Sequence, residues 1–192
     1  SPKVVEITSA NFPDSNIIGV ARSKDSDGDG WLSQNEIADI KSIGLGMFVK
    51  DCSGIEYFTE LRELRVNSAQ DLKKIDVSNN TKLETLMIVL SKITDIDLSR
   101  NTALKSLYLY NNKLTSLDLS KNTELTYLDC SGNQISDFVL GDCPNLESID
   151  CSNNKIGGVL DLSSYSKLSS VYFSKNPITE ISLNGLENLN KV

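Results

Sequence analysis

The chain has 192 residues, with 26 acidic and 19 basic side chains, a formal net charge of −7 and no histidine. The missing histidine excludes a Ser-His-Asp triad, a Cys-His dyad and a histidine-ligated zinc site, and the acidic balance argues against a nucleic-acid partner. No segment approaches the roughly 20 apolar residues of a membrane-spanning helix, so we expect a chain that does not span a membrane.

The first 42 residues contain no internal repeat and predict a helix, an acidic loop and a second helix. Asn11-Phe12-Pro13-Asp14 has the capping residue and early proline of a helix start. Ser33-x-x-Glu36 has the capping-box pattern that begins the next helix. The apolar residues expected on one face of that second helix are Ile37, Ile40 and Ile43.

Between the two helices, residues 25–36 match the D-x-D-x-D-G-x5-E pattern of an EF-hand calcium loop at every defining position. Ca²⁺ prefers about six to eight oxygen ligands in a flexible geometry, and Gly30 permits the sharp turn at the sixth position. The loop also carries four of the negative charges and no basic residue. The expected ligands are the carboxylates of Asp25, Asp27, Asp29 and Glu36, the backbone carbonyl of Trp31, and Ser33 through a water molecule.

A single loop of this kind predicts a structural calcium site, because EF-hands that act as sensors normally work in pairs. The ion would rigidify an N-terminal cap over residues 1–42, and solenoid folds require such caps. Two alternatives stay open. One is an acidic turn that binds no ion; the other is a module similar to dockerins, which carry two loops, usually with aspartate where this chain has Glu36.

From about residue 40 onward a leucine motif recurs at intervals of 21 or 22 residues. The motif is L-x-x-L-x-L/C-x-x-N-x-L, the leucine-rich-repeat signature, and a degenerate first copy begins at Ile40. The clear copies begin at Leu61, Leu83, Leu104, Leu125, Leu146, Leu168 and Leu189. We therefore predict an α/β fold, in which residues 43–192 form a leucine-rich-repeat solenoid of about seven coils.

The L-x-L core predicts one short strand in each coil, because alternate residues of a strand face the same side. The strands of successive coils should form a parallel sheet on the concave face. A coil of this length leaves too little room for a convex helix, so short extended segments and turns are expected there. The asparagines at the ninth position should bond turn backbone in neighbouring coils; they are Asn112, Asn133, Asn154 and Asn176.

The repeats resemble those of a known group of proteins. Residues 114–133, Leu-Thr-Ser-Leu-Asp-Leu-Ser-Lys-Asn-Thr-Glu-Leu-Thr-Tyr-Leu-Asp-Cys-Ser-Gly-Asn, are similar to the short repeats of bacterial surface leucine-rich-repeat proteins, including internalin-like proteins with cysteine inside the repeat. The resemblance covers the chain from about residue 40. It implies an extracellular or cell-surface location in a bacterium and a role in recognition or adhesion, although one fold serves many functions.

The four cysteines form no Cys-x-x-Cys pair, so zinc and thioredoxin patterns are absent. Cys130 and Cys151 occupy the sixth position of successive coils and should point inward side by side. A ladder of small buried thiols, as in the cysteine-bearing repeats, is favoured over a redox pair, since neighbours in a parallel sheet fit disulfide geometry poorly. Cys52 and Cys143 have no assigned role.

The outward positions of the strands predict a partner-binding surface on the concave sheet, because clustered exposed aromatic and methionine side chains mark interaction sites. The alternative is an ordinary strand surface, where tyrosine is common. The residues proposed to contact the partner are Met87, Val89, Tyr108, Tyr110, Tyr127 and Tyr172, with Asp129 and Asp150 as an acidic stripe beside them.

The function expected from these features is non-catalytic recognition or adhesion of a protein or glycan, with a structural calcium ion. A structural spacer or assembly module is the alternative. A glycan-active enzyme that uses Asp129 and Asp150 as a carboxylate pair is less favoured, because an open, shallow sheet lacks a cleft. The exposed last strand also predicts edge-to-edge contact through the C-terminal coil.

Overall fold

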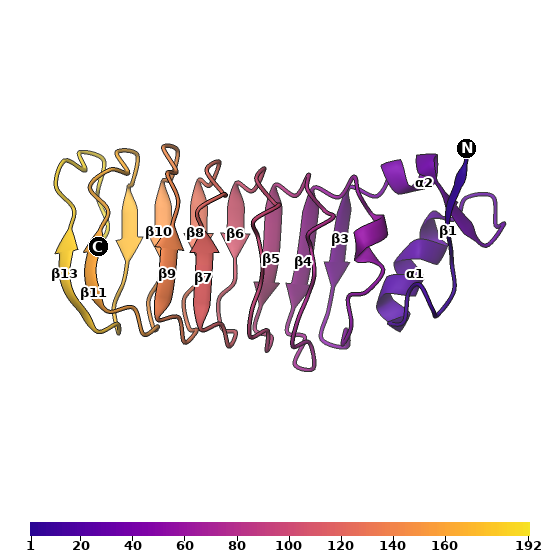
Figure 1. Cartoon of the computed structure of the whole chain (residues 1–192), viewed down its shortest axis with the longest axis horizontal. Helices are drawn as coiled ribbons and strands as arrows, with labels where there is room; N and C mark the ends of the chain where they lie inside the picture. The colour runs from indigo at the N-terminus through magenta and orange to yellow at the C-terminus, as the bar shows by residue number, and fades with distance from the viewer.

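The leucine repeats form one parallel sheet that runs along an elongated solenoid (Figure 1). The computed structural model describes all 192 residues. Seven strands pair in the order β12-β10-β8-β6-β5-β4-β3, so each strand lies beside that of the next coil. They are β3 (Ser42–Leu45), β4 (Glu63–Asn67), β5 (Thr85–Val89), β6 (Ser106–Tyr108), β8 (Tyr127–Asp129), β10 (Ser148–Asp150) and β12 (Ser170–Tyr172).

The register of this sheet follows the sequence repeat. Leu64 pairs with Leu86, and Leu86 pairs with Leu107. Leu107 then pairs with Leu128, and all four side chains are fully buried. A slip of one residue would turn this buried set toward solvent, so the repeat length fixes the register. The predicted leucine-rich-repeat solenoid of about seven coils is confirmed.

The opposite side of the coils, called the return side below, is built from short strands and turns, as the repeat length predicts. A single 3₁₀ turn, η1 (Ile55–Tyr57), lies in the first coil. Farther along, two parallel pairs form, β7 with β9 and β11 with β13. Their bounds are β7 (Ser116–Leu119), β9 (Asp137–Leu140), β11 (Gly158–Asp161) and β13 (Ile178–Ser182).

Buried asparagines tie each coil to the one before it. Asn133 donates through Nδ2 to the carbonyls of Leu109 and Cys130, both at 2.9 Å. Its Oδ1 accepts the backbone N–H of Leu114 at 3.1 Å. The role predicted for the ninth-position asparagines is confirmed, because equivalent bonds are made by Asn112, Asn154 and Asn176.

A second set of buried asparagines, Asn80, Asn101 and Asn122, serves the return side and was not assigned a role from the sequence. Asn101 donates through Nδ2 to Val77 O at 2.9 Å and to Asn80 O at 3.0 Å. The Oδ1 atoms of all three are buried without a hydrogen-bond partner. This set therefore joins successive coils through donated bonds only.

The N-terminal cap combines two helices with a small antiparallel sheet. Strand β1 (Lys3–Glu6) pairs with β2 (Trp31–Ser33), and helix α1 (Ser15–Lys24) lies between them in sequence. Helix α2 (Gln34–Ala38) begins with the predicted capping box, in which Ser33 and Glu36 bond each other's backbone. None of the helices has the length and apolar character needed to cross a membrane.

The prediction that Ile40 and Ile43 lie on the second helix is wrong. Helix α2 ends at Ala38, and Ile43 belongs to β3, where it pairs with Leu64 of the next coil. Ile43 and Leu45 are both buried at a spacing of two, which is the strand period. The helical spacing of the isoleucines continues to Ile43, but the helix ends earlier and residues 42–45 pair with the repeat sheet.

The cap packs directly onto the first coil. The Phe12 ring lies 5.6 Å from the Tyr57 ring and 5.9 Å from the Phe58 ring, between centroids. Gly54 has a φ of +105°, and a Cβ there would meet Phe12 Cδ1 at 2.4 Å, so the site requires glycine. One hydrophobic core of 46 buried residues extends from Val5 to Leu186, so the N-terminal segment and the coils share a continuous core.

Candidate functional site

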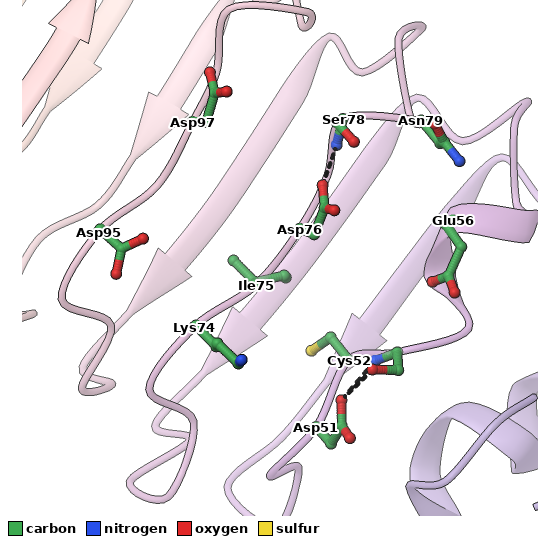
Figure 2. Close-up of a pocket in the computed structure, with 11 residues that line it drawn as sticks. Asp51, Cys52, Glu56, Lys74, Ile75, Asp76, Ser78, Asn79, Asp95 and Asp97 are labelled. Atoms are coloured by element: carbon green, nitrogen blue, oxygen red, sulfur yellow. Dashed lines mark hydrogen bonds between the residues drawn. The ribbon is translucent and has the colours of Figure 1, made fainter. Parts of the chain in front are cut away.

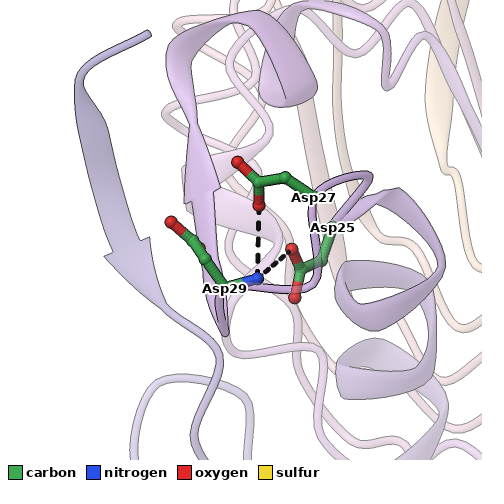
Figure 3. A group of neighbouring side chains, drawn as sticks. All are labelled: Asp25, Asp27 and Asp29. Atoms are coloured by element: carbon green, nitrogen blue, oxygen red, sulfur yellow. Dashed lines mark hydrogen bonds between the residues drawn. The ribbon is translucent and has the colours of Figure 1, made fainter.

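The acidic loop brings three of its predicted calcium ligands together. Carboxylate oxygens of Asp25, Asp27 and Asp29 all lie within 4.8 Å of one another (Figure 3). Asp25 is held by backbone N–H groups, accepting from Gly28 at 2.9 Å and from Gly30 at 3.0 Å. Because Gly30 has a φ of +81°, the loop can turn tightly enough to point these oxygens inward.

A basic residue already contacts this cluster. Lys3 Nζ lies 2.8 Å from Asp29 Oδ2 and 5.5 Å from the centroid of the Trp31 ring. The hydrogen bond from Lys3 lowers the pKa of Asp29, and the same contact raises the pKa of Lys3. The contact depends on the β1–β2 pairing, which sets Lys3 beside Ser33, so it could not be read from the loop sequence.

The remaining predicted side-chain ligands, Glu36 and Ser33, are engaged with each other and not with the aspartates. Glu36 Oε2 accepts from Ser33 N at 2.9 Å and from Ser33 Oγ at 2.8 Å. Its Oε1 accepts from Ser26 N at 2.6 Å and from Ser26 Oγ at 2.7 Å. These bonds hold the pKa of Glu36 at about 2, with the Ser33 backbone contributing most. Glu36 would have to exchange some of these bonds to chelate a metal ion.

The outward face of the seven-stranded sheet carries the predicted partner-binding residues in a line across the strands. Tyr108 is the register partner of Asp129. Asp129 pairs with Asp150, which pairs with Tyr172. We call these four residues the tyrosine–aspartate row. Met87 continues the row on the other side of Tyr108.

Tyr127 and Tyr110 lie beside this row, whereas Val89 does not contribute to it. The rings of Tyr108 and Tyr127 are 4.8 Å apart between centroids, and both side chains are half-buried. The expectation that Val89 is exposed is wrong, since its exposed fraction is 0%. Val89 pairs with Asn67, and the next coil places Tyr110 at the equivalent position. The short side chain of Val89 lies between the longer side chains of Asn67 and Tyr110 and therefore has no accessible surface.

The two aspartates of the row differ from Glu63 and Glu84, whose carboxylates form ion pairs. Partial burial raises the pKa of Asp129, and the neighbouring Asp150 adds to this, while hydrogen bonds from Ser131 act in the opposite direction. Like charges directly opposite each other in a sheet are destabilising. The row is therefore an electrostatically unfavourable arrangement within the folded chain.

All four cysteines are free and buried. Burial raises the pKa of Cys130 well above its usual value, and raises those of Cys52 and Cys151 to about 12. The pKa of Cys143 is raised to about 11, also mainly by burial, and its Sγ donates to Asn122 O at 3.3 Å. Thiols with such pKa values are poor nucleophiles at neutral pH, which favours packing over redox chemistry.

A cavity lies on the return side of the coils (Figure 2), and no residue of the tyrosine–aspartate row lines it. It has a volume of about 600 Å³ and an acidic lining. This cavity was not expected from the sequence, although Asp76 and Asp97, which are 21 residues apart, both line its wall. The charged residues that line it are Asp51, Glu56, Lys74, Asp76, Asp95 and Asp97.

Comparisons with known proteins agree with this architecture. A family model described as Leucine Rich repeats (2 copies) matches residues 123–165, and no curated protein matches the sequence. Internalin C2 from Listeria monocytogenes is similar, with 21% identity and a TM-score of 0.64 over 100% of this chain and 99% of that chain.

This chain also resembles part of two longer proteins of known structure. A leucine-rich-repeat protein of Leptospira interrogans has 17% identity and a TM-score of 0.65, covering 84% of this chain and 50% of that one. A plant peptide hormone receptor, solved in complex with RGF2, has 18% identity and a TM-score of 0.66, covering 83% of this chain and 29% of that one. At these identities the likeness concerns the fold, and the chain has the fold of a leucine-rich-repeat solenoid.

Proposed function

We propose that this chain is a recognition or adhesion module that binds a protein or glycan on the outward face of its seven-stranded sheet. The observation that carries this proposal is the tyrosine–aspartate row, with Tyr127 packed against Tyr108. Tyrosine offers a large, rigid contact surface with a polar end, and it is enriched in interfaces. A solenoid face is a repeated surface on which such residues line up across neighbouring coils.

A non-catalytic role is favoured over an enzyme. Asp129 and Asp150 are adjacent, but neither lines the cavity of about 600 Å³ on the return side or a second cavity of about 220 Å³. Substrate sites usually enclose most of their ligand in a cleft, and these aspartates lie on an open sheet face. The clustering of aromatic side chains also favours recognition over a purely structural spacer, for which a uniformly polar face would be sufficient.

The same proposal includes a structural calcium ion in the acidic loop. Asp25, Asp27 and Asp29 offer the hard oxygen ligands that Ca²⁺ prefers. Trp31 would add its backbone carbonyl, Ser33 a water-mediated contact, and Glu36 a carboxylate released from Ser26. The ion would fasten β2 and α2 to the end of α1 and thereby stabilise the cap.

We place the protein outside a bacterial cell or on its surface. The similarity of its repeats to bacterial surface proteins supports this location. Extracellular calcium sites bind with dissociation constants of about 10⁻⁴ to 10⁻³ M, so a weak site of this kind would be filled in calcium-rich surroundings.

Recognition can be tested by capture of extracellular proteins and glycans on the immobilised chain. A Tyr108→Ala/Tyr110→Ala variant should lose a ligand that the unmodified chain captures. A Val139→Ala/Val159→Ala variant is the matched control, because it removes two exposed apolar side chains on the return side. Capture that survives the tyrosine substitutions, or that both variants lose equally, would contradict the proposal. Unchanged melting of each variant would show that the coils remain folded.

A further inference from the structure

We infer that the tyrosine–aspartate row binds an arginine side chain of a protein partner. This inference rests on the proposed recognition function and specifies the chemistry of the ligand. It is drawn from three properties of the row: an uncompensated pair of carboxylates, oxygen atoms that remain free to accept, and aromatic rings on both sides.

The carboxylate pair has no counter-ion within the chain. Asp129 and Asp150 are direct register partners, which places them on strands about 4.8 Å apart. None of the seven ion pairs includes either residue. Strands β8, β10 and β12 contain no lysine or arginine, and Lys105 of the preceding coil is bonded to Glu84. A cation therefore has to come from outside.

The carboxylates are fixed in place with one oxygen each left over. Asp129 Oδ1 accepts from Ser131 N at 3.0 Å and from Ser131 Oγ at 2.7 Å. Asp150 Oδ1 accepts from Ser152 N at 2.9 Å. The Oδ2 atoms of both residues accept no hydrogen bond. The two Oδ2 atoms, on adjacent strands, are therefore free to accept hydrogen bonds from a ligand.

Tyrosine rings border the carboxylate pair along the row. Tyr108 lies on one side of the pair and Tyr172 on the other, in register. Tyr172 is 39% exposed, and Tyr127 packs against Tyr108 from the next strand. A cation centred on the two aspartates would lie about one and a half strand spacings, roughly 7 Å, from the strands of Tyr108 and Tyr172. A tyrosine ring that leans toward the pair would come within the roughly 6 Å over which cation–π attraction acts.

Among biological cations the guanidinium group fits this set best. It is planar, offers donors in a fixed fork that can reach two acceptors, and stacks on aromatic rings. A calcium ion prefers about six to eight oxygen ligands, and the pair offers only its two free Oδ2 atoms. The ammonium group of lysine lacks the planar fork and is more strongly hydrated, so it should bind more weakly.

The test measures binding of a labelled Gly-Arg-Arg-Arg-Arg-Gly peptide by fluorescence anisotropy at low ionic strength, with the lysine analogue as the comparison. The Asp129→Asn/Asp150→Asn variant should weaken arginine-peptide binding by at least tenfold. The matched control is Asp97→Asn/Asp118→Asn, which removes the same charge one coil apart on the return side, where each aspartate accepts from the serine two residues ahead. The control variant should change the affinity for the arginine peptide by less than twofold. Tyr108→Leu or Tyr172→Leu should weaken binding of that peptide about threefold or more.

Equal losses in the two aspartate variants would show only the attraction of a cationic peptide to an acidic protein, and would overturn the inference. So would unchanged binding in Asp129→Asn/Asp150→Asn, or equal affinity for the lysine peptide. These results leave the recognition proposal intact, because that proposal depends on whether the Tyr108→Ala/Tyr110→Ala variant loses its captured ligand. If a partner is captured equally well by the Asp129→Asn/Asp150→Asn variant and by the unmodified chain, the arginine inference is rejected and the recognition proposal stands.

Discussion

Asp14 joins the cap to the solenoid through Lys50. Its Oδ2 accepts the backbone N–H of Lys50 at 2.8 Å, while its Oδ1 accepts that of Asn16 at 2.8 Å and so caps helix α1. The side chain is 9% exposed. One carboxylate therefore both starts a helix and holds the chain segment that follows the first strand of the sheet.

Replacing Asp14 with alanine should destabilise the protein by about 1 to 2 kcal/mol, since it removes a helix cap and leaves partly buried N–H groups of Asn16 and Lys50 without their acceptor. Urea denaturation followed by circular dichroism measures this. Asp71→Ala is the control, because Asp71 forms only an exposed ion pair with Lys50 and should cost under about 1 kcal/mol. Equal effects of the two substitutions would show that the link between cap and coils is unimportant.

The pH dependence of stability should have opposite signs at Asp129 and Asp97. The pKa of Asp129 is raised in the folded chain, mainly by burial, so its ionised form is disfavoured by folding. Asp129→Asn should therefore stabilise the protein at pH 7, by about 0.5 kcal/mol on the scale of a cross-strand charge pair. This gain should shrink as pH falls through the folded pKa toward the ordinary value of 3.8.

Asp97 provides the contrast. Hydrogen bonds from the Ser99 side chain and backbone lower its pKa, so its contribution to stability is present above pH 3.8 and is lost as pH falls below that value. Asp97→Asn should destabilise the protein at pH 7 and have no effect in strong acid. Unfolding free energies of both variants between pH 7 and pH 2.5 would decide, and a change of the same sign in both would refute the assignment.

Calcium should raise the melting temperature, and chelation should lower it, without changing the fold. With a dissociation constant near 10⁻⁴ M, calcium at about 1 mM adds about 1.4 kcal/mol to the free energy of unfolding, or about 3 to 6 °C to the melting temperature of a domain of this size. Thermal melts in calcium and in EDTA measure the shift. Asp25→Asn/Asp27→Asn should abolish it and Asp97→Asn/Asp118→Asn should retain it, whereas superimposable melts of the unmodified chain would exclude the site.

Lys3 should compete with calcium for Asp29. Because the ammonium group bonds Asp29 Oδ2, Lys3→Met should tighten calcium binding by about two- to fivefold, the scale of an exposed ion pair, while the methionine keeps its contact with Trp31. Calorimetric titration with calcium measures this. Arg22→Met, which removes an unpaired charge near the loop, tests for a general effect of charge, and an equal gain in that variant would argue against direct competition.

Features fixed by residue type and short spacing were predictable from the sequence. The aspartates of the loop converge because they lie two residues apart in a glycine-containing turn. The bonds of Asn133 follow from its place in a repeat whose neighbours are known in advance. In both cases the interacting groups lie at fixed positions in the sequence, either within one loop or one repeat away.

Features set by tertiary neighbours were not predictable in the same way. Val89 is covered because of the size of side chains in adjacent coils, and Ile43 joins a strand because Leu64 is available to pair with it. The Asp14–Lys50 bond spans 36 residues. Sequence periodicity gives the direction of a side chain, but not what lies beside it or what competes for its backbone.

The bonds that Asn133 makes to the preceding coil recur at Asn112 and Asn154 with the same partners one repeat away. A duplicated stretch of 21 residues between Asn112 and Asn133 would therefore find every acceptor it needs already present. Such an insertion should lengthen the molecule by one strand spacing, about 4.8 Å, and move Tyr172 no nearer to or farther from Asp150. The duplicated stretch includes Tyr127 and Asp129, so the longer molecule would also have one more aspartate in its tyrosine–aspartate row.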